Sequence, residues 1–228
     1  MTVPIVLPWP LRSGLEAAAL ALFGLGDQSS ADFLRPAGEA ALVSPDSVSW
    51  RVFKNPLSLF IGGVAAVIME LAEPRVRTGV WEHTTFRIDP IRRLRRTGLA
   101  AMVTIYGARG TAEAMITRIR RMHDKVAGLT PAGKAYRAND PVLLNWVQGT
   151  AAYSLQAYHA YVRPLSDLER DRYYAEGILA ASLYGASAST SEAALEMRFE
   201  AMANQRSART FCSSSYRSCA RRPFCRCS

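Results

Sequence analysis

Residues 55–74 read NPLSLFIGGVAAVIMELAEP, and this stretch decides the fold class. Asn55 is a residue type that caps helix N-termini, Pro56 suits the first position of a helix, and Pro74 ends it. Between the two prolines the chain is almost wholly apolar and carries Glu70 near its end. The stretch is short for a membrane span, so it predicts a helix buried in a protein core.

The combination of a polar cap and a proline recurs along the chain. Asp89-Pro90 predicts a helix that leads into residues 99–106, and Asp140-Pro141 predicts a long helix towards Tyr161. No segment alternates apolar and polar residues for long enough to form a sheet, so we predict an all-α single domain of about six to eight helices. Further helices are predicted for residues 13–25, for residues 111–126 with Gly128 as their stop, and after the capping boxes Ser166–Glu169 and Ser189–Glu192.

The net charge of +9 is concentrated at the C-terminal end. Six arginines and no acidic residue follow Glu200, and the rest of the chain holds 22 basic against 19 acidic residues. That balance favours no nucleic-acid partner. All four cysteines lie after residue 211 in a spacing that fits no zinc pattern, and a cysteine-free body is typical of a reducing compartment. With no signal peptide evident, we expect a cytoplasmic protein, with peripheral membrane association as the alternative.

Composition divides the chain into three parts. Residues 1–47 form an N-terminal helical or irregular segment, and residues 48–206 form the helical domain. Residues 207–228 are rich in Ser, Arg and Cys and have no helical period. Because the composition changes abruptly there, we interpret this last part as an aberrant, disordered tail and not as native family sequence.

His123 is the first candidate site residue. On a helix it shares a face with Ile119 and Val126, while its charged neighbours point elsewhere. An inward imidazole needs a partner for each ring nitrogen, and a metal ion is one such partner. A hydrogen bond within the core is the other, and the pattern alone favours it.

Arg93, Arg96 and Thr97 are the second group of candidates. They stand at positions i, i+3 and i+4, so two guanidinium groups and one hydroxyl share a helix face. This arrangement suits an anionic ligand such as a carboxylate, a phosphate or iron-bound dioxygen. The alternative is a solvated basic face.

Two pairs of neighbouring residues complete the candidates. Glu82 can act as a base and His83 as a metal ligand, although adjacent polar residues are commonly plain surface. Gly62 and Gly63 cost helix stability, so they imply the close approach of a second helix or of a flat cofactor. His159, late in its predicted helix, is interpreted as a surface or interfacial residue.

Taken in order, these segments resemble the family of the fungal oxygenase MpaB and the bacterial rubber oxygenases, the latex clearing proteins. The resemblance covers roughly residues 48–206, and its most specific part is the combination of R-x-x-R-T at 93–97 with H-x-x-V-x-G at 123–128. The other matching elements are Trp50, Gly62-Gly63, Glu73-Pro74, Gly79 to His83, Asp89-Pro90, Tyr106-Gly107, Gly133, Tyr136, Asp140-Pro141 and Trp146-Val147.

The resemblance implies a helical, globin-like core around haem b and the cleavage of carbon–carbon double bonds with dioxygen. By it, His123 matches the proximal iron ligand, Arg93 and Thr97 match residues beside the dioxygen site, and Glu82 matches an acidic base. Arg96 falls where the rubber-cleaving enzymes carry a lysine that can cap the iron. An arginine has no lone pair to give, so Arg96 cannot be that ligand.

The sequence also departs from the family at Gln148, where relatives usually have histidine. We therefore expect a haem b-dependent oxidoreductase of the oxygenase type, acting on a hydrophobic organic substrate with dioxygen or peroxide. One alternative is a non-haem metal enzyme that uses Glu82, His83, His123 and His159. The other is an inactive helical protein that binds a lipid or terpenoid.

Overall fold

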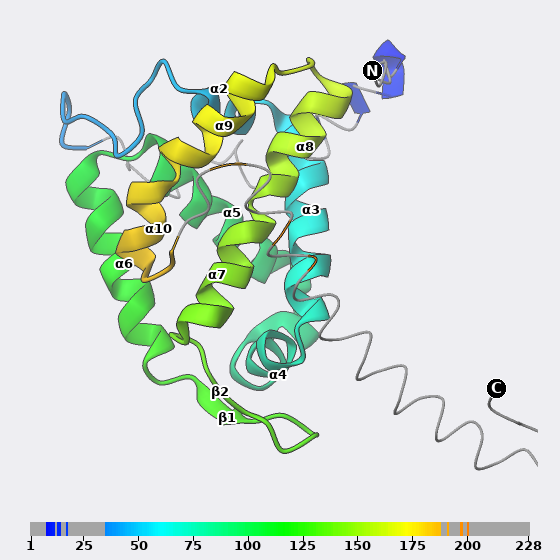
Figure 1. Ribbon diagram of the computed structural model, residues 1–228, viewed down its shortest axis with the longest axis vertical. Coiled ribbons are helices and arrows are strands. Elements are labelled where there is room, and N and C mark those ends of the chain that lie inside the picture. The colour runs from blue at the N-terminus through cyan, green and yellow to red at the C-terminus, as the bar shows by residue number, and fades with distance from the viewer. Residues whose placement is uncertain are drawn as a thin grey trace, which may run out of the picture.

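A computed structural model describes residues 35–187 continuously, and residues 8–11, 13–14, 17, 191, 197 and 200 besides. The predicted all-α class is confirmed, with one small hairpin added (Figure 1). The predicted helix at 13–25 lies largely outside the described residues, and the tail 207–228 lies outside them entirely. The elements are α2 (Val48–Lys54), α3 (Pro56–Ala72), α4 (Pro74–His83), the 3-10 turn η1 (Thr85–Arg87), α5 (Pro90–Tyr106), α6 (Arg109–His123), β1 (Ala127–Leu129), β2 (Ala135–Arg137), α7 (Pro141–Thr150), α8 (Ala152–Tyr161), α9 (Asp167–Glu176) and α10 (Ile178–Tyr184).

The predicted helix starts are confirmed by their caps. The side chains of Asn55, Asp89 and Asp140 each accept a hydrogen bond from a backbone N–H in the first turn of α3, α5 and α7. Ser166 and Glu169 form the predicted capping box at α9. These caps satisfy N–H groups that have no partner within their own helix.

Three local predictions were wrong in their bounds. The long helix expected from Pro141 to Tyr161 is broken into α7 and α8, because Gly149 loosens the turn and the Thr150 hydroxyl bonds back to the Val147 carbonyl. Helix α6 ends at His123 and not at residue 126, so Gly128 falls in β1. Strands β1 and β2 form an antiparallel hairpin, which is too short for an alternating pattern to reveal it.

Helix α3 packs along α8, and Gly62 makes this contact possible (Figure 1). A Cβ atom at Gly62 would lie 2.3 Å from the Ser154 Cα, so no larger residue fits there. The sequence predicted that a second helix or a flat cofactor approaches these glycines closely. At Gly62 the close neighbour is helix α8. Gly63 is half-buried in the same helix.

Helices α5 and α6 form an antiparallel pair joined at Gly107 and Ala108. Arg93 lies 14 residues before Gly107, and His123 lies 16 residues after it. At about 1.5 Å of rise per residue, the two positions stand at nearly the same level. The short connection thereby brings the two predicted motifs side by side.

No single helix in the described part of the chain is long and apolar enough to cross a membrane. Helices α2 and α3 pass such a test only together, as a pair bent by 91°.

Candidate active site

Arg93 and Thr97 lie one turn apart on α5, and both are half-buried. The Arg93 guanidinium donates a short hydrogen bond to the Thr97 hydroxyl, and that hydroxyl donates to the Arg93 carbonyl oxygen at 3.1 Å. Of the three residues predicted to share a helix face, Arg93 and Thr97 are thus in contact. The consequence is that Thr97 fixes the direction of the Arg93 side chain.

His123 is the last residue of α6 and is half-buried. Its Nδ1 atom is buried and has no hydrogen-bond partner. Burial lowers the pKa of the imidazole, and the charge of Arg93 lowers it further, while Asn139 and Asp124 act in the opposite direction. The result is a neutral imidazole with an unused ring nitrogen, which is the form that binds metals.

Glu70 is a buried carboxyl group in the last turn of α3. Burial raises its pKa, although the charge of Arg93 and the Thr150 hydroxyl oppose the rise. The Thr150 Oγ1 lies 3.3 Å from Glu70 Oε1 and only 2.6 Å from the Val147 carbonyl oxygen. The Val147 carbonyl is therefore the principal acceptor of the Thr150 hydroxyl, and Glu70 Oε1 is a longer, weaker one.

These residues form one group around the Arg93 guanidinium. Its charge lowers the pKa of both Glu70 on α3 and His123 on α6, so both groups lie within electrostatic range of α5, and Thr150 adds α7 through its contact with Glu70. We name this group the Arg93 site and define it as Glu70, Arg93, Thr97, His123 and Thr150. It contains a fixed cation, a carboxyl group of raised pKa and a neutral imidazole, the combination found where protons and anions are handled.

Glu70 was not among the residues predicted to form a site. A signal for it is present in the sequence, because it is the only ionisable residue between Pro56 and Ala72. A carboxyl group inside an otherwise apolar helix is costly to bury and needs partners there.

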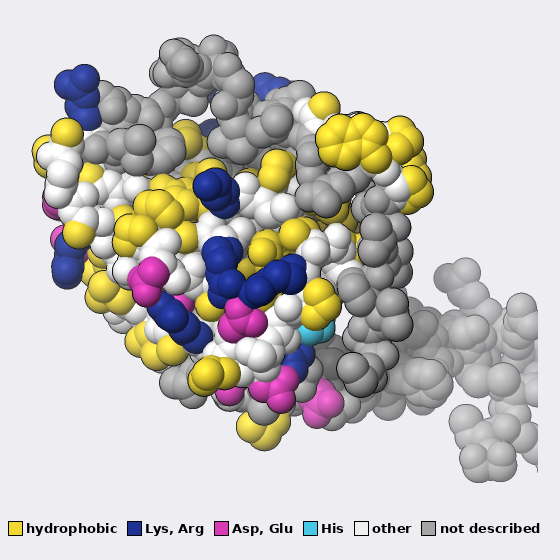
Figure 2. Space-filling model, turned by 90° about the horizontal axis from the view of Figure 1, so that it is seen from above, with side chains coloured by type: hydrophobic (Ala, Val, Ile, Leu, Met, Phe, Trp, Pro, Cys, Tyr) yellow, Lys and Arg dark blue, Asp and Glu magenta, His cyan; other side chains and the backbone are white. Residues whose placement is uncertain are grey.

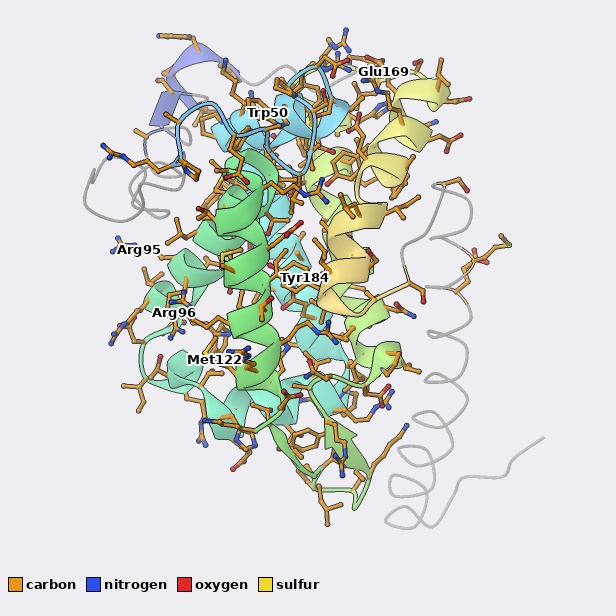
Figure 3. The ribbon with its side chains drawn as sticks, turned by 90° about the vertical axis from the view of Figure 1, so that its left-hand side faces the viewer. Trp50, Arg95, Arg96, Met122, Glu169 and Tyr184 are labelled. Carbon is orange, nitrogen blue, oxygen red and sulfur yellow. The ribbon has the colours of Figure 1, made fainter. Side chains whose placement is uncertain are left out.

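Two predicted residues lie away from the Arg93 site. Glu82 is exposed on α4, where its charge acts on Tyr136, and it has no described contact with Arg93 or His123. It is therefore Glu70, and not Glu82, whose pKa the charge of Arg93 affects. Arg96 is also exposed, and its side chain points outward from α5 (Figure 3).

The remaining polar candidates have local structural contacts. His83 lies 3.2 Å from the Tyr136 hydroxyl, and His159 Nδ1 accepts a hydrogen bond from the Leu165 backbone N–H. Gln148 is half-buried beside Gly177. Among the described residues, no group of three or more His, Cys, Asp or Glu could hold a metal ion. The four residues of the non-haem alternative are thus not brought together.

A comparison with models of protein families shows to which family the chain belongs. Residues 50–223 match the model of the ER-bound oxygenase mpaB/B'/Rubber oxygenase catalytic domain. The chain belongs to this family. The match covers every element from α2 to α10 and all of the Arg93 site, and it ends beyond the boundary predicted at residue 206. No curated protein and no solved structure matches the chain.

Proposed function

We propose that this oxygenase-family domain is a haem b-dependent oxidoreductase in which His123 is the axial ligand. We further propose that it oxidises a hydrophobic organic substrate with dioxygen or peroxide. The observation that carries the proposal is the Nδ1 of His123, which is buried and makes no hydrogen bond of ordinary geometry among the described residues, in an imidazole whose lowered pKa favours the neutral form. An unsatisfied buried nitrogen costs stability, and such groups are kept where a ligand completes them.

The residues at His123 fit a haem. A haem needs one protein ligand and not a cluster of three, and the sequence has no C-x-x-C-H motif, so attachment would be non-covalent. Asn139 supports the same interpretation. Its amide nitrogen donates to the Arg120 carbonyl and to Asp124, while its Oδ1 is buried and unpaired. That oxygen favours the protonated ring and is available to orient it, as acceptors beside metal-bound histidines do.

Bound haem supplies the iron that activates dioxygen or peroxide. The Arg93 guanidinium is permanently charged, so it stabilises negative charge that develops on an oxygen atom near it. Thr97 keeps that guanidinium in one direction through its hydrogen bond. Both groups are in place before any reaction, which removes the cost of reorienting them.

Glu70 takes the role of proton donor and acceptor that the resemblance assigned to Glu82. Burial raises the pKa of this carboxyl group and so favours its protonated form, and the charge of Arg93 favours release of the proton. A group poised in this way can give a proton to an anion held by Arg93 and later take it back. Glu82 is exposed and lacks this environment.

The test is haem binding by the purified full chain. Haemin is added to the wild type, to His123→Ala and to His83→Ala, and the Soret band and the pyridine haemochrome are recorded. His83 is a matched control because it is an exposed histidine outside the Arg93 site. We expect a Soret band in the wild type and in His83→Ala, and its loss or strong shift in His123→Ala. An unchanged band in His123→Ala would refute His123 as the ligand, and a wild type without a haemochrome would refute the haem.

A further inference from the structure

The outer face of α5 and α6 is strongly basic. On α5, Arg92 and Arg95 lie on the side away from the Arg93 site, with Arg96 between that side and Arg93. On α6, Arg118 and Arg121 are one helical turn apart, and Lys125 follows just beyond the end of the helix. Figure 3 shows Arg95, Arg96 and Met122 along the same side of the molecule. We name this surface the α5–α6 basic face. Its exposed basic residues are Arg87, Arg92, Arg95, Arg96, Arg118, Arg121 and Lys125.

The charge of this face is largely not neutralised by the protein itself. Among the described residues, no ion pair involves Arg92, Arg96, Arg118, Arg121 or Lys125. Two carboxylates lie at its edges and have other hydrogen-bond partners. Asp89 caps the first turn of α5, and Asp124 accepts a hydrogen bond from the Asn139 amide. An excess of positive charge therefore remains exposed on one side.

The opposite arrangement is found on the face seen from above, where basic and acidic side chains lie next to one another (Figure 2). There Arg51 and Arg163 both bind Glu169, and Arg172 bridges Asp46 and Glu176. Exposed arginines in this protein can therefore be neutralised by neighbouring carboxylates. The α5–α6 basic face differs because Arg92, Arg96, Arg118, Arg121 and Lys125 form no ion pair with the described residues.

Large apolar side chains project from the same face. Ile88, just before α5, is 89% exposed, Ile91 is 45% exposed, and Met122 on α6 is 43% exposed. They stand between the arginines and do not line a groove. Cationic side chains interleaved with projecting aliphatic ones are the pattern of surfaces that lie on anionic membranes, where the cations meet headgroups and the apolar groups enter the interface.

We propose that the α5–α6 basic face docks this domain on the surface of an anionic phospholipid membrane. An acidic protein would be attracted by the same charges, but it offers no apolar phase for projecting Ile88 and Ile91. Docking on this face also keeps the Arg93 site near the membrane, because Arg96 lies between the outer side of α5 and Arg93. The proposal is independent of the function proposed above, since docking requires neither haem nor turnover.

The test is co-sedimentation of the full chain with vesicles of phosphatidylcholine, with and without phosphatidylserine. The variant Arg92→Gln/Arg118→Gln/Arg121→Gln removes three charges from the face, and Arg51→Gln/Arg109→Gln/Arg163→Gln removes three that are paired with carboxylates. The two variants have the same net charge as each other, three lower than that of the wild type, and both keep the arginines after residue 200. We expect the first variant to lose binding to the phosphatidylserine vesicles by on the order of 100-fold, and the second to resemble the wild type.

A single change, Ile88→Ser, separates the apolar contribution from the charge. It is expected to reduce the binding that survives at high salt, because salt screens the charges but not the inserted side chain. Circular dichroism establishes that each variant is folded. Equal loss of binding in both triple variants, or binding that does not depend on phosphatidylserine, would overturn the proposal. Retention on a polyglutamate column without any vesicle binding would overturn it in favour of an acidic protein partner.

Discussion

Two places in this fold bring carboxylates and arginines together, and they do so in opposite ways. At the junction of α2 and α9, the Glu176 carboxylate accepts hydrogen bonds from the backbone N–H groups of Val48 and Ser49, from the Ser49 hydroxyl and from Arg172, all at 2.7–3.0 Å. Nearby, the Ser166 backbone N–H lowers the pKa of Glu169 to about 2, with Arg51 and Arg163 adding to the effect. Both carboxylates there are well satisfied.

The Arg93 site uses the same residue types and leaves them short of partners. Burial raises the pKa of Glu70, and its contact with Thr150 is long. The described hydrogen bond of the Arg93 guanidinium goes to its own helix, at Thr97. His123 contributes a buried Nδ1 that makes no hydrogen bond of ordinary geometry among the described residues, although Asn139 favours its protonated form.

The contrast separates stabilising polar groups from functional ones. A carboxylate with several donors lowers the free energy of the folded state, whereas a buried group with too few partners raises it. A protein retains the second kind where a ligand or a reaction supplies the missing partner. The junction of α2 and α9 therefore holds the fold together, and the Arg93 site is where chemistry is expected.

The largest effect is expected at the junction. Glu176→Ala leaves the N–H groups of Val48 and Ser49 in the first turn of α2 without their acceptor. We expect the free energy of unfolding to fall by about 3 kcal/mol, the scale of losing hydrogen bonds to a charged group at a partly buried position. Urea denaturation measures it, with Glu113→Ala as the control because Glu113 makes an ion pair only with Arg109. If the free energy of unfolding falls no more than in the control, the junction does not stabilise the fold.

A smaller effect of opposite sign is expected at Glu70. A folded-state pKa above the unfolded value means that the folded protein binds this proton more tightly, so stability is lost as the pH rises through the folded pKa. Glu70→Gln removes that loss. The variant should match the wild type near about pH 4, where the carboxyl is mostly protonated in both states. At about pH 8 it should be more stable by about 1 kcal/mol.

Thermal unfolding at the two pH values measures this difference, and Glu82→Gln is the control because Glu82 is exposed. If Glu70→Gln is instead less stable than the wild type at the higher pH, the carboxylate is ionised and paired with Arg93. The Arg93 site would then be a salt bridge like those of the junction, and the contrast between the two places would fail.

The sequence was most informative where structure depends on near neighbours. Asn55, Asp89 and Asp140 cap their helices through contacts two or three residues away, so their role can be predicted without knowing the fold. The pairing of Arg93 with Thr97 is equally local, because it follows from helical spacing. The hairpin that follows α6 packs against the distant helix α4 and was missed. The break at Thr150 was missed as well, although its hydrogen bond to Val147 is local.

The same reasoning explains what was missed at the site. Glu82 was chosen because it stands beside His83 and ahead of Arg93 in the sequence, but its position on α4 leaves it in solvent. Glu70 enters the Arg93 site only through the packing of α3 against α7 and near α5, which no spacing reveals. Its isolation in an apolar stretch was the available sign. The predicted role of His123 remains a proposal that haem binding must test.

The smallest effect is expected at Glu169, and it sharpens the comparison. A pKa held near 2 in the folded state means that this carboxylate stabilises the protein above its ordinary pKa of 4.5 and loses that contribution as the pH falls towards 2. Because the group is close to solvent, Glu169→Gln should cost no more than about 1 kcal/mol at neutral pH, less at high salt, and nothing at about pH 2. Unfolding measured against pH checks this, with Glu113→Gln as the control because Glu113 is half-buried and pairs with Arg109. The stability difference between variant and wild type should therefore vary with pH for both glutamates but carry opposite signs at neutral pH. Equal signs would mean that the two carboxyl groups are held in the same way, and the distinction between a stabilising and a functional carboxyl group would have to be abandoned.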